Sequence, residues 1–423
     1  MSAGYAITTY KIQLNYKHLD WFKQTQSLFD AVLAFYYELL EKQPETLSLS
    51  NQNLLRHLEL QTIKQRDGTP PETPLPFEKI PLYFRRAAIN AAISMYRSYM
   101  GKLKAWQEGP IKSGKPSPPK CLHMSMLYYK GMYKDFDEKS ILLKLYTGKT
   151  WAWVKHHYTG RPFPENAELM SPTIVIKKKK VMLHIPVKEI VEDSRTAKER
   201  VQQNEKFVAV ALTGSDSLAV CTTIEADGRA TAPYFIKGGK ELAHRRKLLL
   251  GYTKRGIARN NTSRLITQPV ANRPNKKYYD KITRLTDHYA HEVSRKIVDY
   301  ALKQGAKLIV LPELKESFNQ AKKPYLGKTP YDFIGRRIVR YVQYKAWQKG
   351  LVAMTSKPYY ASTRCYHCGA PIAKHNTEYQ NPSPNFYGGK NFMCKEGHRG
   401  STALNSARNL GKGFYERFYA GAA

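Results

Sequence analysis

The spacing of hydrophobic and polar positions changes along the first hundred residues. Residues 5–14 alternate with a period of two, which predicts a β-strand. Residues 19–42 and 85–107 instead carry apolar side chains at helical spacing, and a loop rich in Pro and Thr (67–81) separates them. The N-terminal part therefore predicts one strand followed by two long amphipathic helices.

After a linker rich in Pro and Lys (109–120), short alternating runs return. The runs 140–148, 151–160 and 173–191 predict strands, and a lysine run within the last one predicts a tight turn from Lys177 to Lys180. Together with the strand at 5–14, these runs predict a small β-barrel that the helices interrupt in sequence. Such a barrel requires the first strand to pair with strands more than a hundred residues away.

From about residue 205 strands and helices alternate. Residues 207–212 predict a buried strand, 217–226 and 230–237 its antiparallel followers, and 307–314 a later hydrophobic strand. A basic helix is predicted from residue 240, and long amphipathic helices at 276–305 and 332–347. This order predicts a mixed sheet flanked by helices, as in RNase H-like domains.

Charge identifies the class of partner. The 423 residues include 69 Lys and Arg against 34 Asp and Glu, a net charge of +35. Such a surplus repels itself unless a polyanion neutralises it, so nucleic acid is the expected partner, and a ribosomal or other basic housekeeping protein is the alternative. The 30 tyrosines add rings that can stack on bases.

The remaining composition points to the inside of a cell. No run of eighteen apolar residues occurs and the N-terminus lacks an apolar signal segment, so no membrane partner is expected. Only five cysteines occur, three of them in one metal-type cluster, which argues for a reducing compartment. We expect a soluble protein of the bacterial cytoplasm, associated with the nucleoid when bound to DNA.

The cysteine cluster predicts a structural zinc site. Cys365 and Cys368 form C-x-x-C, and Cys394 precedes His398 at C-x₃-H spacing, which zinc accepts as a Cys₃His set. Two alternatives stay open. His375 could replace His398 as the fourth ligand, or the site has decayed and Cys394 is only structural.

Four segments, in order, resemble the TnpB nucleases and the type V CRISPR effectors (Cas12-like) that descend from them. Residues 176–187 resemble the end of the family's oligonucleotide-binding barrel, 207–220 the first RuvC motif and 306–314 the second. The cysteine segment followed by Asn405-Ser-Ala-Arg-Asn409 resembles the third. The cysteine segment (the zinc knuckle, 361–399) departs from the family pattern, because its second half lacks a fourth cysteine.

The resemblance implies three metal-binding carboxylates, and none is present. The corresponding positions hold Ala211, Pro312 and Ala403, none of which can bind a divalent cation. Glu313 would point to the opposite face of a strand from Pro312, and Asp216 would lie roughly 16 Å beyond Ala211 along an extended strand. We therefore expect no catalytic Mg²⁺ and a nuclease-inactive protein. Natural loss and engineered replacement of the acids both remain open.

The implied fold class is an α+β multidomain protein. It combines an oligonucleotide-binding β-barrel, which carries a helical recognition insert, with an RNase H-like (RuvC) α/β domain that carries a zinc-knuckle insert. The expected boundaries are 1–15 for the first strand of the barrel (wedge) domain, 16–115 for the helical recognition domain, 116–203 for the rest of the barrel, 204–360 for the degenerate RuvC-like domain with its basic helix, 361–399 for the zinc-knuckle (target nucleic-acid-binding) module and 400–423 for the final RuvC-like helix.

Basic side chains on the predicted helices and hairpin are the candidate nucleic-acid contacts, although a solvated helix face or hairpin tip explains them as well. They are Arg85, Arg86, Arg97, Lys177, Lys178, Arg245, Arg246, Lys247, Lys254, Arg255, Arg259, Arg264, Arg336, Arg337 and Arg340.

The resemblance implies an RNA-guided protein that binds double-stranded DNA beside a short motif and forms an R-loop. Without cleavage, such a protein would act by occupying its DNA target or by recruiting other proteins to it. The expected partners are transposition proteins, or RNA polymerase and its sigma factor. The proline-containing strand resembles the transposon-associated type V-K effectors, which are longer. We expect a monomer or a homodimer on one guide RNA. The alternatives are an active Mg²⁺-dependent nuclease that uses displaced acids, and an RNA-binding protein without a DNA target.

Overall fold

The computed structural model describes residues 4–65, 68–109, 114–137, 139–160, 162–214, 216–263, 275–314, 330–375 and 389–419. The chain forms two compact units. The N-terminal unit is Ile7–Glu189, and the C-terminal unit is Ile190–Ala423 together with Met1–Ala6. In the described part of the chain, no helix has an apolar stretch long enough to cross a membrane.

The N-terminal unit combines helices with one large sheet. Its helices are α1 (Leu19–Lys42), α2 (Asn51–Thr62) and α3 (Leu82–Glu108), with a 3₁₀ turn η1 (Pro44–Ser48) between α1 and α2. Its strands are β1 (Tyr5–Asn15), β2 (Met126–Leu127), β3 (Tyr133–Lys134), β4 (Ser140–Tyr146), β5 (Trp151–Thr159), β6 (Glu168–Leu169), β7 (Thr173–Lys177) and β8 (Lys180–Ile190).

The strand order confirms the predicted non-local pairing. The order is β2-β7-β8-β1-β5-β4-β3, so β1 lies between strands more than a hundred residues later in the sequence. The turn from β7 to β8 pairs Lys177 with Lys180, as predicted. No pairing in the described residues joins β2 to β3, so closure into an oligonucleotide-binding barrel stays a prediction.

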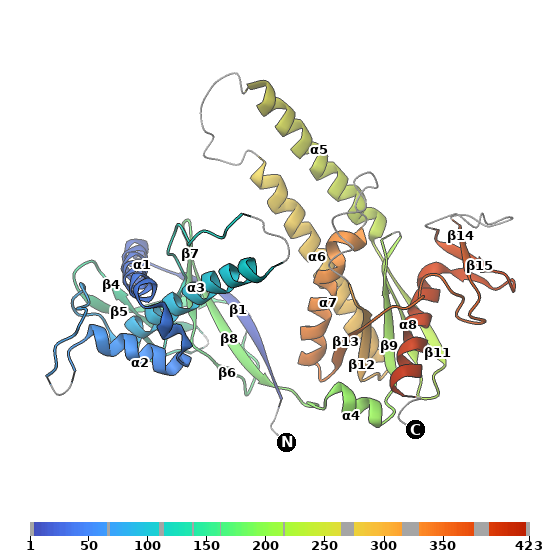
Figure 1. Ribbon diagram of the computed structural model, residues 1–423, viewed down its shortest axis with the longest axis horizontal. Helices are drawn as coiled ribbons and strands as arrows, with labels where there is room; N and C mark the ends of the chain where they lie inside the picture. Colours follow the sequence, from blue (N-terminus) through green and yellow to red (C-terminus); the bar gives the residue numbers. More distant parts are fainter. Residues whose placement is uncertain are drawn as a thin grey trace. The chain divides into compact units, whose positions relative to one another are not determined.

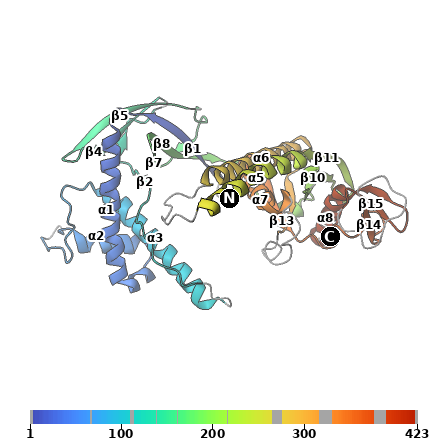
Figure 2. The same cartoon turned by 90° about the horizontal axis from the view of Figure 1, so that it is seen from above.

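One core holds the helices and the sheet of this unit together. Phe29 and Tyr36 of α1 are buried beside Phe84 of α3, and the inward side chains Ile141 and Leu143 of β4 belong to the same cluster. Figure 2 shows α1 and α3 crossing beneath the curved sheet. The periodic pattern of residues 19–42 and 85–107 is thus satisfied by burial of one face of each helix.

The sequence pattern did not single out α2. Its segment is rich in Asn, Gln and His, and only Leu54 and Leu58 among its leucines are fully buried. The missed signal was the helix start, where the Ser50 hydroxyl accepts a hydrogen bond from the Asn53 amide at 3.3 Å. A serine at this position satisfies an amide that the first helical turn leaves unpaired.

The C-terminal unit is built on a five-stranded sheet. Its helices are α4 (Ala197–Gln202), α5 (Gly239–Ser263), α6 (Lys276–Lys303), α7 (Pro330–Gln348) and α8 (Thr402–Phe418). Its strands are β9 (Phe207–Leu212), β10 (Ser217–Ile224), β11 (Ala230–Lys237), β12 (Leu308–Pro312) and β13 (Val352–Ser356), followed by a small sheet of β14 (Ile372–His375), β15 (Asn391–Cys394) and β16 (Arg399–Ser401).

The order β11-β10-β9-β12-β13 matches the predicted mixed sheet, because β10 runs antiparallel to β9 and β11 while β12 runs parallel to β9 and β13. Helices α6 and α7 cover one face and α8 covers the other (Figure 1). Alternate residues of β9 serve the two cores: Val208 faces α6 and α7, whereas Phe207 and Ala209 face α8. Ala211 therefore points to the α8 side.

A buried arginine joins segments that lead into three strands of this unit. Arg200 of α4 is fully buried and donates to the carbonyl oxygens of Lys307 at 2.9 Å and Gly350 at 3.0 Å, which precede β12 and β13. It also donates to the Asp193 and Arg195 carbonyls in the segment before α4. The carboxylate of Asp193 lies 3.2 Å from the same guanidinium and balances its charge.

One detail of α7 differs from the sequence prediction. The sequence of this helix predicts that Ile338, Tyr341, Val342 and Tyr344 form its inward face. Ile338 and Val342 are buried, but the Tyr344 side chain is 40% exposed and Tyr341 is half-buried. The buried stripe follows a spacing of four, from Ile334 through Val342 to Ala346, because such residues lie on one side of a helix.

Packing of α8 on the sheet predicts a sharp difference between two of its glycines. A Cβ at Gly411 would lie 2.6 Å from the side chain of Ile224 and 3.0 Å from Ala209, whereas a Cβ at Gly413 would meet no atom within 4 Å. Gly411→Ala should lower the unfolding free energy of this unit by about 1–3 kcal/mol through overpacking. Gly413→Ala should leave it unchanged or raise it by up to about 1 kcal/mol through helix propensity.

Thermal and denaturant unfolding of both variants measures this difference. The two substitutions carry the same gain in helix propensity, so their difference isolates the contact between α8 and the sheet. Equal stability of the two variants would contradict the packing described here.

Candidate functional site

A hollow of about 310 Å³ lies at the end of β9, beside the first turns of α8. It is lined by Ala211, Leu212, Thr213, Asp216, Ser217, Phe235, Gly389, Lys390, Asn391, Ser401, Thr402, Ala403 and Ser406. Two of the three positions at which the family resemblance places carboxylates, Ala211 and Ala403, thus face one space.

The third position, Pro312, ends the neighbouring strand β12. The parallel register pairs Leu308 with Phe207 and ends with Val310 opposite Ala209. A continuation of this register by two residues would bring Pro312 level with Ala211. Leu308 and Val310 face α8, so Pro312, two residues further along the strand, belongs to that face as well. Two of the three positions predicted from sequence thus line one hollow, the third ends the neighbouring strand, and all three side chains are apolar.

The position of Asp216 corrects the sequence analysis. The chain does not continue as an extended strand beyond Leu212 but turns back into β10, so that Ala211 pairs with Val220. Asp216 consequently lines the same hollow as Ala211 and is not remote from it. Its carboxylate lies 3.9 Å from the ammonium group of Lys240. The antiparallel pairing predicted for 207–212 and 217–226 implies this reversal, and the distance calculated for an extended strand did not take it into account.

Glu313 lies on different surfaces. It lines two hollows, one with Arg336 and Arg340 of α7 and another with Lys357 and Arg417, and neither is lined by Ala211 or Ala403. Its amide donates to the Ser356 carbonyl at 2.9 Å, which continues the pairing of β12 with β13. Among the described residues, Asp216 is the one acid that lines the hollow with Ala211.

The asparagines that follow Ala403 have a structural role. Asn405 and Asn409 lie one turn apart on α8, and both donate to the Arg364 carbonyl at 2.7 Å. Asn405 also accepts a hydrogen bond from the Tyr366 amide at 2.8 Å, and Asn409 donates to the Ala361 carbonyl at 3.2 Å. The two side chains fix the turn that carries the first cysteine to the helix next to the hollow.

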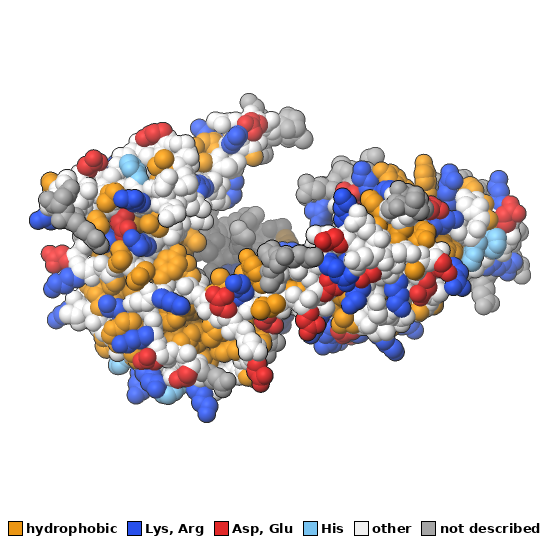
Figure 3. All heavy atoms as spheres, turned by 90° about the horizontal axis from the view of Figure 1, so that it is seen from below, with side chains coloured by type: hydrophobic (Ala, Val, Ile, Leu, Met, Phe, Trp, Pro, Cys, Tyr) orange, Lys and Arg blue, Asp and Glu red, His pale blue; other side chains and the backbone are white. Residues whose placement is uncertain are grey.

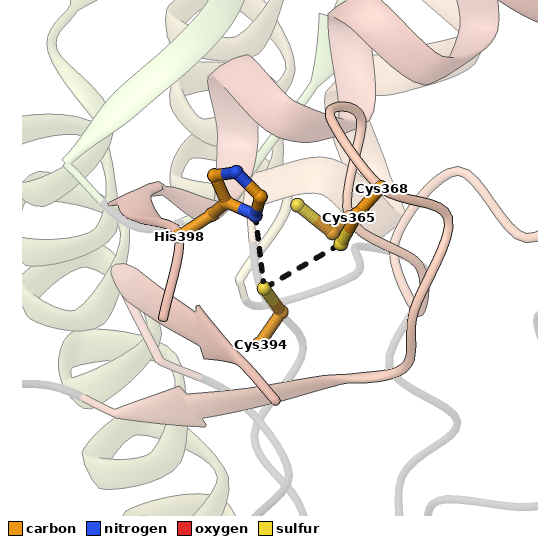
Figure 4. A group of neighbouring side chains, drawn as sticks. All are labelled: Cys365, Cys368, Cys394 and His398. Atoms are coloured by element: carbon orange, nitrogen blue, oxygen red, sulfur yellow. Dashed lines mark hydrogen bonds between the residues drawn. The ribbon is translucent and has the colours of Figure 1, made fainter. Parts of the chain in front are cut away.

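The predicted metal ligands come together. Cys365, Cys368, Cys394 and His398 place one ligand atom each within 4.8 Å of one another. Figure 4 shows their side chains pointing toward a common centre. His375 ends β14, and its side chain lies outside the described residues. Within the described residues, His398 completes a set of four with the three cysteines.

The distances within this cluster fit zinc. The sulfur atoms of Cys368 and Cys394 are 3.6 Å apart, and the Cys394 sulfur is 3.4 Å from Nδ1 of His398. A tetrahedral ion with Zn–S bonds of about 2.3 Å separates two sulfurs by about 3.8 Å. Burial raises the pKa of the Cys394 thiol, but hydrogen bonds with the side chain and backbone of His398 outweigh it and lower that pKa to about 7. A thiol of this kind readily gives the thiolate that zinc binds.

Two glycines shape the turns that present the ligands. Gly369 and Gly397 have φ values of +72° and +77°, a region that side chains with a Cβ disfavour. Their amides donate to the carbonyls of Cys365 and Cys394, at 2.9 and 3.0 Å. Each turn thus folds around one cysteine. Cys₃His can hold one zinc ion here, and its role would be structural because four protein ligands leave no open position.

The predicted basic contacts of the C-terminal unit lie mainly on α5 and α7. Arg245, Lys247, Lys254, Arg255 and Arg259 are exposed on α5. Arg246 is half-buried, and burial lowers its pKa. Arg264 lies outside the described residues. On α7, Arg336 and Arg340 are exposed.

Arg337 of α7 has a partner within its own unit. Its guanidinium contacts the carboxylate of Asp287 on α6 at 2.7 Å, and the Tyr341 hydroxyl donates to the same carboxylate. This contact therefore helps to hold α6 and α7 together.

In the N-terminal unit, the arginines of α3 are engaged within the fold. Arg85 is 9% exposed and contacts Glu59 at 2.8 Å, and Arg86 contacts the other carboxylate oxygen of Glu59 at 2.9 Å. Burial raises the pKa of Glu59, but hydrogen bonds from Arg86 and Arg85 together outweigh this effect. The net pKa is lowered, so the carboxylate stays charged. Arg97 donates to the backbone of Leu49 at 2.9 Å.

Lys177 and Lys178 lie exposed at the tip of the β7–β8 hairpin. On the face shown in Figure 3, Lys and Arg side chains occur on both units among Asp and Glu. The basic surplus is thus distributed over the face in view.

Two family models match parts of the chain. Residues 336–410 match the TNB domain of Cas12f1-like proteins, and residues 6–147 match the Aq_aa04 family. A curated relative, the CRISPR-associated endodeoxyribonuclease Cas12f1 of Sulfoacidibacillus thermotolerans, is 30% identical over 139 residues. That alignment covers 33% of this chain and 29% of the relative, so the matched segment spans less than a third of the curated protein.

Solved structures share the fold over nearly the whole chain. A Cas12f1–sgRNA–target DNA complex contains a chain that matches with a TM-score of 0.57 at 13% identity, covering 94% of this chain and 83% of that one. C2c1 of Alicyclobacillus acidoterrestris with single-guide RNA matches with a TM-score of 0.51 at 11% identity, covering 94% and 70%. The α+β multidomain architecture with a RuvC-like C-terminal region is therefore that of the Cas12 proteins.

The cysteine cluster generates a test of its ligands. The purified protein should contain about one zinc per chain, and its cobalt form should show the absorption of a tetrahedral thiolate site. Cys368→Ser and His398→Ala should each lower the zinc content and the thermal stability of the protein, measured by elemental analysis and thermal unfolding.

His367→Ala and His375→Ala serve as controls. The His367 ring stacks on that of His398 at 5.1 Å but does not belong to the cluster. Full zinc content in His398→Ala, with loss in His375→Ala, would assign the fourth ligand to His375.

Proposed function

We propose that this chain, a compact relative of the TnpB and type V CRISPR effectors, is an RNA-guided protein that binds double-stranded DNA without cutting it. A guide RNA supplies sequence recognition by base pairing, and the protein reads a short motif beside the target and holds the opened duplex as an R-loop. The printed names of its relatives supply the precedent: one is an endodeoxyribonuclease, and another was solved with guide RNA and target DNA.

The observation that carries the proposal is the apolar character of Ala211, Pro312 and Ala403. A RuvC-type reaction uses divalent ions to activate water and to stabilise the leaving oxygen, and these ions require carboxylate oxygens. Supporting this, Ala211 and Ala403 line one hollow, and Pro312 ends the strand that pairs with β9. Alanine and proline supply no ligand there, so we expect no catalytic Mg²⁺.

An active nuclease that uses displaced acids is the alternative enzyme. Asp216 favours it, since this side chain lines the hollow. Against it, Glu313 lines other hollows, and Lys240 lies 3.9 Å from the Asp216 carboxylate. One carboxylate beside a cation is a poor site for two divalent ions, so binding without cleavage is the better-supported function.

The basic helix α5 is the proposed guide-binding element. Its exposed cations include Arg245, Lys254 and Arg255, and the Arg255 guanidinium lies 4.8 Å from the centre of the Tyr252 ring. Figure 1 shows α5 and α6 as a long pair of helices that extends from the sheet. Such contacts give affinity and salt dependence but read no sequence, which agrees with recognition by a guide.

A protein that binds DNA without cutting it would act by occupying the target site or by recruiting other proteins to that site. Two uses are proposed: marking a target for transposition proteins, and controlling transcription by blocking or recruiting RNA polymerase with its sigma factor. Pro312 in the second RuvC strand resembles the transposon-associated branch and favours the first use. The genes that neighbour its coding sequence distinguish the two, and the mass of the purified complex distinguishes a monomer from a homodimer on one guide.

Guide-directed binding is tested with the complex purified from its native host. Its co-purified RNA is sequenced, and duplexes that match or mismatch the variable end of that RNA are compared in gel shifts. The matched duplex should bind at least about 100-fold more tightly than one mismatched beside the flanking motif, because early mismatches abort pairing. Equal binding to both would leave an RNA-binding protein without a DNA target.

The role of α5 is tested by gel shifts of the guide-free protein with the identified guide RNA at several salt concentrations, comparing the wild type with the double variant Lys254→Gln/Arg255→Gln. Loss of two phosphate contacts should weaken guide binding and reduce the slope of its salt dependence by about two. Arg229→Gln, an exposed arginine in the β10–β11 turn paired with Asp227, is the matched control and should leave the slope unchanged.

A further inference from the structure

Three large aromatic side chains are exposed beside the end of β13. Tyr359 and Tyr360 are 60% and 66% exposed, and Phe418 at the end of α8 is 40% exposed. Exposed rings of this size lose contact with the core and gain nothing in water, so a cluster of them indicates a binding surface. The sequence motifs did not point to any of the three.

Each ring has an arginine against it. The Arg417 guanidinium lies 5.3 Å from the centre of the Tyr359 ring and 5.8 Å from that of Phe418, and Arg364 lies 4.8 Å from that of Tyr360. A cation above an aromatic face is attracted to its π electrons. The arrangement combines flat apolar faces with fixed positive charges.

The backbone holds these rings in place. Tyr360 has a φ of +52°, which is uncommon for a tyrosine, and its carbonyl accepts hydrogen bonds from the amides of Thr363 and Arg364 at 3.0 and 3.1 Å. The next residue, Ala361, is buried, and its carbonyl accepts the hydrogen bond from Asn409 of α8. The aromatic turn is thus anchored to the same helix as the hollow, and its unusual backbone persists because several bonds fix it.

The hollow that Glu313 lines together with Lys357 and Arg417 adjoins this turn and has a volume of about 480 Å³. It is lined by Tyr359, Phe418, Lys357, Arg417 and Glu313, with Thr355 and Ser356. Its volume is in the range of sites that hold small ligands. Lys357 and Arg417 suit a phosphate, whereas the Glu313 carboxylate repels one and can accept a hydrogen bond from an amino group.

We propose that the surface formed by Tyr359, Tyr360 and Phe418 with Lys357, Arg364 and Arg417 binds an unpaired nucleotide of a single strand. The base stacks on an aromatic ring, the phosphates contact the cations, and the amino group of a base such as cytosine donates to Glu313. Stacking on rings within a basic groove is the usual mode of single-strand binding. A paired base is excluded, since both of its faces are already stacked in a duplex.

This surface goes beyond the proposed function because it requires neither a guide nor a matched target. Its ligand could come from the guide RNA or from DNA opened at a target, and both supply the same base and phosphate chemistry. Binding of the full-length chain without a guide to the twelve-nucleotide strands dC12 and rC12 therefore tests the surface and distinguishes the two sources.

The readout must separate stacking from charge, because a chain with a net charge of +35 binds any polyanion. An abasic twelve-mer carries the same phosphates as dC12 but has no bases. The wild-type protein should bind dC12 at least about 10-fold more tightly than the abasic strand. Tyr359→Ala should bring this ratio close to one, and Tyr359→Phe should retain it since the ring remains.

Two further variants complete the design. Tyr360→Asn should also reduce the ratio, and asparagine tolerates the positive φ at this position. Tyr279→Ala on α6, 50% exposed and outside the surface, is the matched control and should leave the ratio unchanged.

A measurement on the wild-type protein removes any dependence on how the variants fold. A strand with 5-iodocytosine, irradiated in the complex, should crosslink to the peptide that contains residues 359–364. Tighter binding of rC12 would support the guide as the source, and tighter binding of dC12 would support an opened DNA strand. Equal affinity for dC12 and the abasic strand, or crosslinks confined to other peptides, would overturn the proposal and leave guide-directed duplex binding untouched.

Discussion

The C-terminal unit depends on one buried guanidinium. Arg200 satisfies carbonyl groups directly ahead of β12 and β13 and in the segment before α4, so it joins segments that lead into strands distant in sequence. A buried arginine requires such partners, because an unpaired charge in the interior is costly. Burial lowers the pKa of Arg200, and the charges of Asp193 and Glu205 oppose that effect and keep it protonated.

The pairing of β9 with β12 determines what lies at the other end of the sheet. These two strands run parallel, so Ala211 and Pro312 lie near the ends of neighbouring strands, and α8 brings Ala403 to the hollow lined by Ala211. Gly411 permits this approach because a larger side chain would collide with Ile224. Ala211 and Ala403 thus line one hollow, and they are apolar, as is Pro312 on the neighbouring strand.

The cysteine module is connected to the same helix. Asn405 and Asn409 hold the turn that contains Cys365, so the metal site, the aromatic turn and the hollow share α8 as a common support. The asparagines following Ala403 therefore have a structural role that does not depend on catalysis. Their hydrogen bonds preserve a surface, whether or not carboxylates lie beside it.

Local patterns predicted the local features well. The period-two run at 5–14 became β1, the apolar run at 207–212 became β9, the lysine run became the β7–β8 turn, and the cysteine spacing gave a cluster that fits zinc. Features that depend on tertiary contacts were missed. The antiparallel turn after Leu212 was predicted, but its consequence, the position of Asp216 in the hollow, was not. The roles of Asn405 and Asn409 arise from a turn forty residues away. The boundaries of the individual domains stay predictions.

The most direct test of binding without cleavage is whether a plasmid that carries the matched target stays uncut when the complex binds it. The native protein–RNA complex is incubated with Mg²⁺ and a supercoiled plasmid that carries the matched target, and the plasmid is then probed with permanganate and sequenced. Binding without cleavage predicts reactive, unpaired thymines within the target of a plasmid that remains supercoiled. A nick or a double-strand break at a fixed distance from the target would contradict the account and assign catalysis to residues such as Asp216.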